Sequence, residues 1–211
     1  MPHVFLPVLA FAAAWGVLVL TPGTETALII RLSISVGRTT AIGAVLGIAA
    51  GLTLWGIGTA FGLSALIAAS HTLYLVLEWA CAGYLLSLAF RLAVNVLRST
   101  PETETDSENQ APKAFWSGFQ RGMFTTILNP LVGVFDLTAF PQFIPPEVNA
   151  VTYALLLTVV QAALTLTWYF TLAFTALFFS RFLANPVVVR VLDGLTALVF
   201  VIFAIRLVIS G

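Results

Sequence analysis

The chain has 211 residues, of which 60% are hydrophobic and only 9% are charged, and its nine basic and nine acidic side chains cancel. Soluble domains carry about a quarter of their residues as charged side chains, so this composition excludes an ordinary soluble protein and indicates one that is dissolved in the lipid bilayer. Without a basic patch, nucleic acid is also excluded as a partner.

Long uncharged stretches indicate helices that cross the bilayer. Residues 1–24, 39–77 and 148–180 contain no Asp, Glu, Lys or Arg, and about 20 apolar residues suffice for one helical crossing. These stretches are apolar on every side, whereas the strands of a membrane barrel alternate apolar and polar residues. We therefore predict an all-α integral membrane protein with six transmembrane segments, at residues 4–30, 39–63, 72–97, 117–142, 150–180 and 187–209.

One hydrophilic stretch, from Arg98 to Lys113, divides the six segments into two sets of three. It predicts a first three-helix repeat at residues 1–97, a hydrophilic cytoplasmic linker at 98–114 and a second three-helix repeat at 115–211. Three crossings precede the linker, so the second repeat enters the membrane from the opposite side. The two repeats are therefore expected to be inverted relative to each other.

The basic residues predict which side each connection faces. Eight of the nine flank the first, third and fifth connections, and Arg206 is the exception. Because cytoplasmic loops are enriched in Lys and Arg, the odd connections are expected in the cytoplasm. Both termini are then external or periplasmic, in a multi-pass protein of a bacterial inner membrane.

The first and fourth segments each contain a predicted break. Pro22-Gly23 interrupts the first segment and Asn129-Pro130 interrupts the fourth. Proline lacks an N–H and collides with the preceding helical turn, and a broken helix offers free carbonyls on one side and N–H groups with a positive dipole end on the other. Such interruptions in corresponding positions of two halves are typical of transporter binding sites. The alternative is that both prolines only kink packed helices.

The polar residues around the breaks form the predicted substrate site: Thr21, Pro22, Gly23, Thr24, Glu25, Asn129, Pro130 and Asp136. A charged side chain at a helix centre costs about 2.5–3.5 kcal/mol, so it normally faces a cavity or a partner. Glu25 and Asp136 are also the candidate proton carriers if burial favours their protonated forms. For Glu25, stabilisation of a helix start or an ion pair is the alternative.

Two further groups are expected to have structural roles. Glu78 and Arg206 lie near the outer ends of the third and sixth segments, which predicts an ion pair. Gly43, Gly47 and Gly51 recur every four residues, a spacing that lets helix backbones approach closely. This stripe packs helices either within the bundle or between the protomers of a homodimer.

Several motifs together resemble the lysine/homoserine–threonine exporter family (LysE/RhtB). They are Leu20-Thr21-Pro22-Gly23, Arg31, Ser35, Gly37-Arg38, the glycine stripe, Gly62-Leu63, Ala82-Gly83-Tyr84-Leu85-Leu86, Arg91, Phe119-Gln120-Arg121-Gly122, Asn129-Pro130 and Phe140-Pro141-Gln142-Phe143. The resemblance implies secondary transport that exports amino acids or close analogues, driven by an ion gradient, with no nucleotide, no cofactor and no enzymatic step. The chain departs from the family pattern at Leu52, Thr24, Leu131 and Asp136, which bears on the substrate more than on the transport role.

Two other functions remain open from sequence. A divalent-cation exporter needs several carboxylates, histidines or thiols around one ion, and Glu25 and Asp136 are the obvious candidates. An intramembrane enzyme or assembly factor could use Ser33, Ser35, His71 and Asp136, although no motif brings these residues together. No phosphate-binding loop occurs, which speaks against ATP-driven pumping. The leading prediction is an exporter of amino acids or similar small zwitterions, coupled to an ion gradient, with proton coupling favoured and no bound metal.

Overall fold

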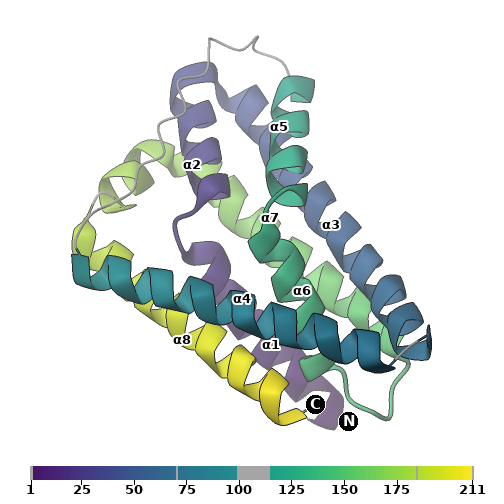
Figure 1. Cartoon of the computed structure of the whole chain (residues 1–211). Helices are drawn as coiled ribbons and strands as arrows, with labels where there is room; N and C mark the ends of the chain where they lie inside the picture. The colour runs from purple at the N-terminus through teal and green to yellow at the C-terminus, as the bar shows by residue number, and fades with distance from the viewer. Residues whose placement is uncertain (1, 70, 99–114, 184, 211) are drawn as a thin grey trace.

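The computed structural model describes residues 2–69, 71–98, 115–183 and 185–210, and each element in these ranges is a helix (Figure 1). The elements are α1 Pro2–Leu20, α2 Thr24–Arg31, the π-helix η1 Leu32–Val36, α3 Arg38–Ala69, α4 His71–Arg98, α5 Phe115–Ile127, α6 Pro130–Phe143, α7 Ala150–Leu183 and α8 Pro186–Ser210. The all-α prediction is confirmed for these residues. Most of the predicted linker, residues 99–114, lies outside them.

The break at Pro22-Gly23 is present and has a local cause. Thr21 closes the last turn of α1, because its hydroxyl donates to the Val17 carbonyl over 2.9 Å and its N–H donates to the Leu18 carbonyl over 3.1 Å. Pro22 cannot continue this ladder, and Gly23 is extended, with φ −146° and ψ −167°. The chain resumes as α2 at an angle of 56° to α1.

The break at Asn129-Pro130 is built differently. Asn129 is the N-cap of α6, and its side-chain oxygen accepts from the N–H of Leu131 over 3.1 Å. Pro130 occupies the first helical position, where its missing N–H costs nothing. Across the break, Trp55 of α3 donates its indole N–H to the last carbonyl of α5, that of Ile127, over 3.3 Å. The helices α5 and α6 meet at 57°.

Three described helices are long and apolar enough to cross a membrane by themselves: Arg38–Gly62 in α3, Ala150–Phe179 in α7 and Val187–Arg206 in α8. Counting each bent pair, α1 with α2 and η1, and α5 with α6, as one crossing raises the number to five. These segments coincide with five of the six predicted ones. The remaining prediction corresponds to α4, which packs along α8 (Figure 1).

The glycine stripe lies inside the bundle, between α3 and α5. A Cβ added at Gly43 or Gly47 would collide with the main-chain oxygen of Phe115 or Phe119, and Gly122 of α5 meets the backbone of Ala44 in the same way. Small residues thus let the two helices approach to backbone contact. Beyond the end of α5, Gly58 of α3 has nothing within 4 Å of an added Cβ, so the close approach of α3 to α5 does not extend to this position.

Aromatic rings fill the half of the bundle away from α2 and α5. Phe11 of α1 contacts Phe140 and Phe143 of α6, with ring centroids 5.5 and 5.6 Å apart. Phe135 of α6 lies 5.5 Å from Phe203 of α8. Because these rings are buried and come from three helices, they pack α1, α6 and α8 together at this end of the molecule.

Candidate transport site at the helix breaks

The two breaks meet at the carboxylate of Glu25. This residue lies in the first turn of α2, directly after the first break, and it is buried. Its Oε1 accepts a hydrogen bond of 2.8 Å from the Thr126 hydroxyl of α5, and its Oε2 accepts one of 3.1 Å from the Tyr169 hydroxyl of α7. The Asn129 side chain also interacts with this carboxylate. One acidic group therefore links α2 to the last turn of α5 and to the second break.

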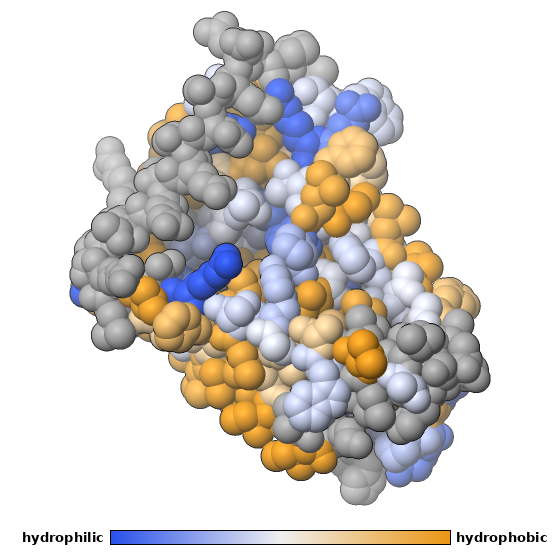
Figure 2. All heavy atoms as spheres, viewed as in Figure 1, coloured by the Kyte–Doolittle hydropathy of each residue, from blue (hydrophilic) through white to orange (hydrophobic). Residues whose placement is uncertain are grey.

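The main chain at the first break stays open. Gly23 is the N-cap of α2 and supplies no side-chain hydrogen bond, so the first N–H groups of α2 have no side chain to cap them. Gly23 and Thr24 are exposed, as is Pro130 at the second break. Figure 2 shows hydrophilic and intermediate residues running down the middle of this face, between apolar flanks. The breaks thus combine accessible backbone with a buried acid.

The centre of α7 carries a buried polar stripe that reaches both halves of the chain. Gln161, Thr165 and Tyr169 are spaced four residues apart and therefore share one face of the helix, and all three are buried. The Tyr169 hydroxyl donates a hydrogen bond to Glu25. The Thr165 hydroxyl accepts a hydrogen bond of 2.9 Å from the indole N–H of Trp15 in α1. The amide of Gln161 donates a hydrogen bond of 2.7 Å to Asp136 in α6.

Asp136 is fully buried but does not join the Glu25 cluster. Its Oδ1 accepts from Gln161, and its Oδ2 has no hydrogen-bond partner. Gln161 precedes Tyr169 by eight residues, which corresponds to about 12 Å along α7. The two predicted acids therefore occupy separate positions on the same stripe, with Glu25 beside the breaks and Asp136 closer to the aromatic end.

Thr21 connects the first break to α8. Its hydroxyl lies in hydrogen-bond contact with the hydroxyl of Thr196, which is buried. The structure thus places Thr21, Glu25 and Asn129 at the breaks. The side chain of Thr21 bonds to α8, that of Glu25 to α5 and α7, and that of Asn129 to the start of α6. Asp136 bonds elsewhere. The predicted ion pair of Glu78 with Arg206 cannot be followed, because the Glu78 side chain lies outside the described residues.

Sequence reasoning missed four polar residues: Thr126, Tyr169 and Gln161, which bind the two acids, and Thr165, which binds Trp15. A signal existed for three of them. A Gln, a Thr and a Tyr four residues apart in an uncharged segment mark a polar face, and such a face is expected to turn into the bundle. Within the described side chains, no group of three or more His, Cys, Asp or Glu residues lies close enough together to hold a metal ion.

Comparison with known proteins gives the family. The model of the family described as LysE type translocator matches residues 16–211. The chain is 26% identical over 202 residues to the uncharacterised membrane protein YrhP of Bacillus subtilis, covering 94% of this chain and 96% of that protein. It is 29% identical over 169 residues to the homoserine/homoserine lactone efflux protein of Salmonella typhimurium, covering 78% and 79%. No solved structure matches it. Because the family match covers nearly the whole sequence, the chain belongs to the LysE type translocators, which are transporters and not enzymes.

Proposed function

We propose that this protein exports small amino acids with uncharged side chains, or close analogues of them, from the cytoplasm, using a proton gradient. The observation that carries the proposal is the meeting of the two helix breaks at one buried carboxylate, through the Thr126–Glu25 hydrogen bond of 2.8 Å. Family membership makes the chain a translocator, and a relative is named for efflux of homoserine and its lactone.

The breaks offer complementary groups for a zwitterion. The uncapped N–H groups at the start of α2 suit a carboxylate, since the positive end of a helix dipole favours anions. Glu25 and the free carbonyls at the end of α1 suit an ammonium group. Glu25 is the acidic side chain that the described structure brings to the breaks. A single acidic side chain at the breaks can pair with one ammonium group of the substrate. This favours amino acids with neutral side chains over amino acids such as lysine, which carry a second positive charge.

The same proposal includes six crossings arranged as two inverted repeats, with α4 as the sixth crossing. The bends of 56° and 57° occur in the first crossing of each half. Helices in corresponding positions also pack together, α3 against α7 and α4 against α8, as expected around a pseudo-twofold axis in the membrane plane. In Figure 1 the start of α1 and the end of α8 lie close together, as expected if the number of crossings is even.

Alternating access would then use the break region as its centre. The aromatic cluster of Phe11, Phe135 and Phe203 closes one end, while Gly23 and Thr24 are exposed. On the topology that the basic residues predict, the closed end faces outward. This conformation corresponds to a carrier that is open to the cytoplasm and ready to load substrate.

Counterflow in proteoliposomes tests the proposal. The purified full chain is reconstituted in vesicles loaded with unlabelled homoserine, and uptake of labelled homoserine is measured against vesicles without protein. We expect transient accumulation that excess neutral amino acid suppresses and lysine does not. An imposed pH gradient should drive accumulation without counter-substrate, and a protonophore should abolish it.

Two results would contradict the proposal. Accumulation of lysine in preference to homoserine would remove the argument from a single acid at the breaks. Absence of transport for a full panel of amino acids, by protein that elutes as a homogeneous species, would remove amino-acid export itself.

A further inference from the structure

Asp136 and Gln161 leave two buried acceptor atoms without donors. The amide N–H of Gln161 donates 2.7 Å to Oδ1 of Asp136. The other oxygen of each group, Oδ2 of Asp136 and Oε1 of Gln161, is buried without a hydrogen-bond partner. Both residues have no exposed surface. Leaving a buried polar atom unpaired is unfavourable, so two such acceptors on one bonded pair favour a state in which a donor stands between them.

Among the side chains that the structure describes, no positive charge compensates the Asp136 carboxylate. The titratable side chains described on the helices around α6 are Arg38 of α3, Cys81, Tyr84 and Arg91 of α4, Arg121 of α5, Tyr153 and Tyr169 of α7, and Arg190, Asp193 and Arg206 of α8. None of them acts on Asp136, whose partner among the described residues is the neutral amide of Gln161. A charged carboxylate in this position would be buried and unpaired, which is strongly unfavourable.

We propose that Asp136 and Gln161 form the pair that carries the coupling proton, separate from the substrate site at the breaks. A proton that binds Oδ2 of Asp136 turns this oxygen into a donor and neutralises the carboxylate. The amide oxygen of Gln161 can accept that proton in a hydrogen bond while the amide N–H continues to donate to Oδ1. One proton thereby removes the charge and satisfies both unpaired atoms, and Gln161 is the positioning residue.

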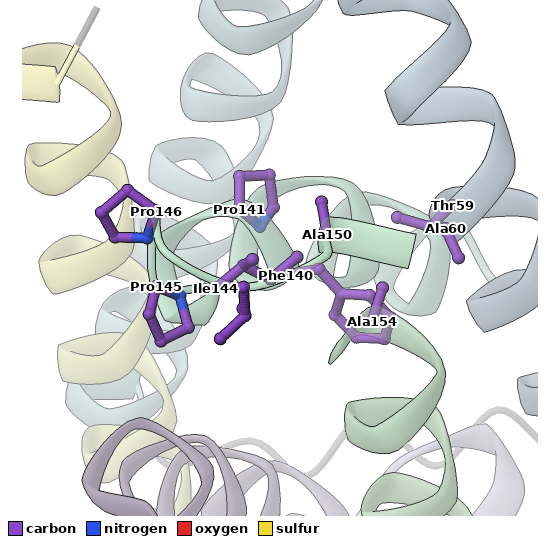
Figure 3. A pocket seen from close by; sticks show the side chains of 10 residues that line it. Thr59, Ala60, Phe140, Pro141, Ile144, Pro145, Pro146, Ala150 and Ala154 are labelled. Atoms are coloured by element: carbon purple, nitrogen blue, oxygen red, sulfur yellow. The ribbon is translucent and has the colours of Figure 1, made fainter. Parts of the chain in front are cut away.

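A cavity lies one helical turn from Asp136 along α6 and two turns from Gln161 along α7. A cavity of about 220 Å³ is lined by Phe140 of α6, Ala154 of α7 and Thr59 of α3 (Figure 3). Phe140 follows Asp136 by one turn, and Ala154 precedes Gln161 by two turns. About 10–15 Å³ suffices for a water molecule that finds polar partners, and in this largely apolar lining the unpaired Thr59 hydroxyl is such a partner. It opens beside the connection from α6 to α7, which is external on the predicted topology.

This inference rests on the proposed function, and it divides the work between the two acids. Both oxygens of Glu25 already accept hydrogen bonds, from Thr126 and Tyr169, so Glu25 is satisfied as a carboxylate. Both oxygens of Asp136 have a hydrogen-bond partner only when the carboxyl group is protonated. Release of its proton towards the cytoplasmic side and reloading from the cavity would drive the cycle, while substrate binds about 12 Å away along α7.

The test compares coupled and uncoupled transport of homoserine in proteoliposomes. Asp136→Asn should lower accumulation driven by a pH gradient by about tenfold or more, the effect of a change of about one pH unit in driving force. Counterflow, which needs no net proton movement, should stay within about twofold of the wild type. Gln161→Leu should show the same split, and Gln142→Leu is the matched control, because Gln142 also has an unpaired amide oxygen but binds backbone carbonyls instead of a carboxylate.

A swapped pair and infrared spectroscopy distinguish coupling from a merely structural role. Asp136→Asn combined with Gln161→Glu rebuilds an acid–amide pair with its members exchanged, and we expect it to regain coupling that Asp136→Asn alone has lost. The wild type should show the carbonyl band of a protonated carboxyl, absent in Asp136→Asn and shifted in Gln161→Leu.

Several outcomes would overturn the proposal. These are full pH-driven accumulation by Asp136→Asn, accumulation that follows a sodium gradient instead of pH, and loss of counterflow together with coupling, which would place Asp136 in the substrate site. If the wild type transports no amino acid, the proposed function fails. The infrared band then tests the Asp136–Gln161 pair by itself: a protonated-carboxyl band that Asp136→Asn removes supports the pair, and its absence from the wild type contradicts it.

Discussion

At the scale of single residues, the hydrogen bonds of Glu25 are the feature on which the substrate site depends. Thr126 and Tyr169 each donate to a different oxygen of this buried carboxylate. A hydrogen bond to a charged group contributes about 1.5–3 kcal/mol, and loss of one donor leaves the charge less compensated. Both bonds cross between elements, so they hold the start of α2 against α5 and α7.

Removal of either donor should therefore weaken transport without preventing folding. We expect Tyr169→Phe and Thr126→Val each to lower counterflow of homoserine by about tenfold, which corresponds to about 1.4 kcal/mol. Glu25→Gln should lower it further, because it also removes the charge that would attract an ammonium group. The matched control is Thr167→Val, since Thr167 lies on the exposed side of α7 and its hydroxyl donates to the Ala163 carbonyl of the same helix. Equal loss in this control would show that any hydroxyl of α7 is needed.

How far sequence reasoning reaches is visible at these same residues. Pro22-Gly23 and Asn129-Pro130 were predictable because the information is local: a proline without an N–H and a glycine or capping side chain decide the backbone where they stand. The partners of Glu25 were not predictable, since Thr126 and Tyr169 lie 101 and 144 residues away in the sequence. Only tertiary packing brings them to Glu25. Asp136 was identified as a buried acid, but its partner Gln161 was not, because a lone glutamine carries no motif.

At the scale of elements, the two broken crossings differ in how they are held open. The second break is closed off by its own capping side chain and by the indole of Trp55, whereas the first has a glycine N-cap and exposed backbone. This asymmetry places the N–H groups without a side-chain cap in the first half. The inverted-repeat prediction could not foresee it, because it treats the two breaks as equivalent.

Repair of the first break should abolish transport. Alanine is favoured over proline by about 3 kcal/mol and over glycine by about 1 kcal/mol in a helix, so Pro22→Ala with Gly23→Ala favours one continuous helix from α1 into α2. We expect the variant to reach the membrane in normal amounts, but to show no counterflow. Pro7→Ala is the matched control, because Pro7 lies within the unbroken α1, and it should transport normally. Normal transport by the repaired helix would remove the break from the mechanism.

The contact between α3 and α5 predicts a position-dependent effect of one added methyl group. A Cβ at Gly47 would meet the Phe119 carbonyl, whereas one at Gly58 would meet nothing within 4 Å. Overpacking costs about 1–3 kcal/mol, so Gly47→Ala should lower the melting temperature of the detergent-solubilised protein. Gly58→Ala should leave it unchanged or raise it slightly, since alanine is the better helix former. Similar shifts for both variants would mean that α3 and α5 are not in backbone contact.

At the scale of the whole molecule, the remaining question is whether α4 crosses the membrane. The described helices give three clear crossings and up to five with the bent pairs. The hydropathy pattern predicts a sixth at residues 72–97, within α4 His71–Arg98. The parity of the crossings decides the matter, because an even number puts the two termini on the same side and an odd number puts them on opposite sides.

Reporter tags on the two termini measure this parity directly. We expect tags before α1 and after α8 both to be digested by protease added to intact cells whose outer barrier has been removed, since the basic residues place both ends externally. As an internal check on a Cys81→Ala background, a cysteine in place of exposed Glu147, between α6 and α7, should react with an impermeant maleimide from outside. A cysteine in place of exposed Ser35, before α3, should react only after permeabilisation. If one tag alone is digested, α4 does not cross, the halves cannot be inverted repeats, and the proposed alternating access loses its symmetry.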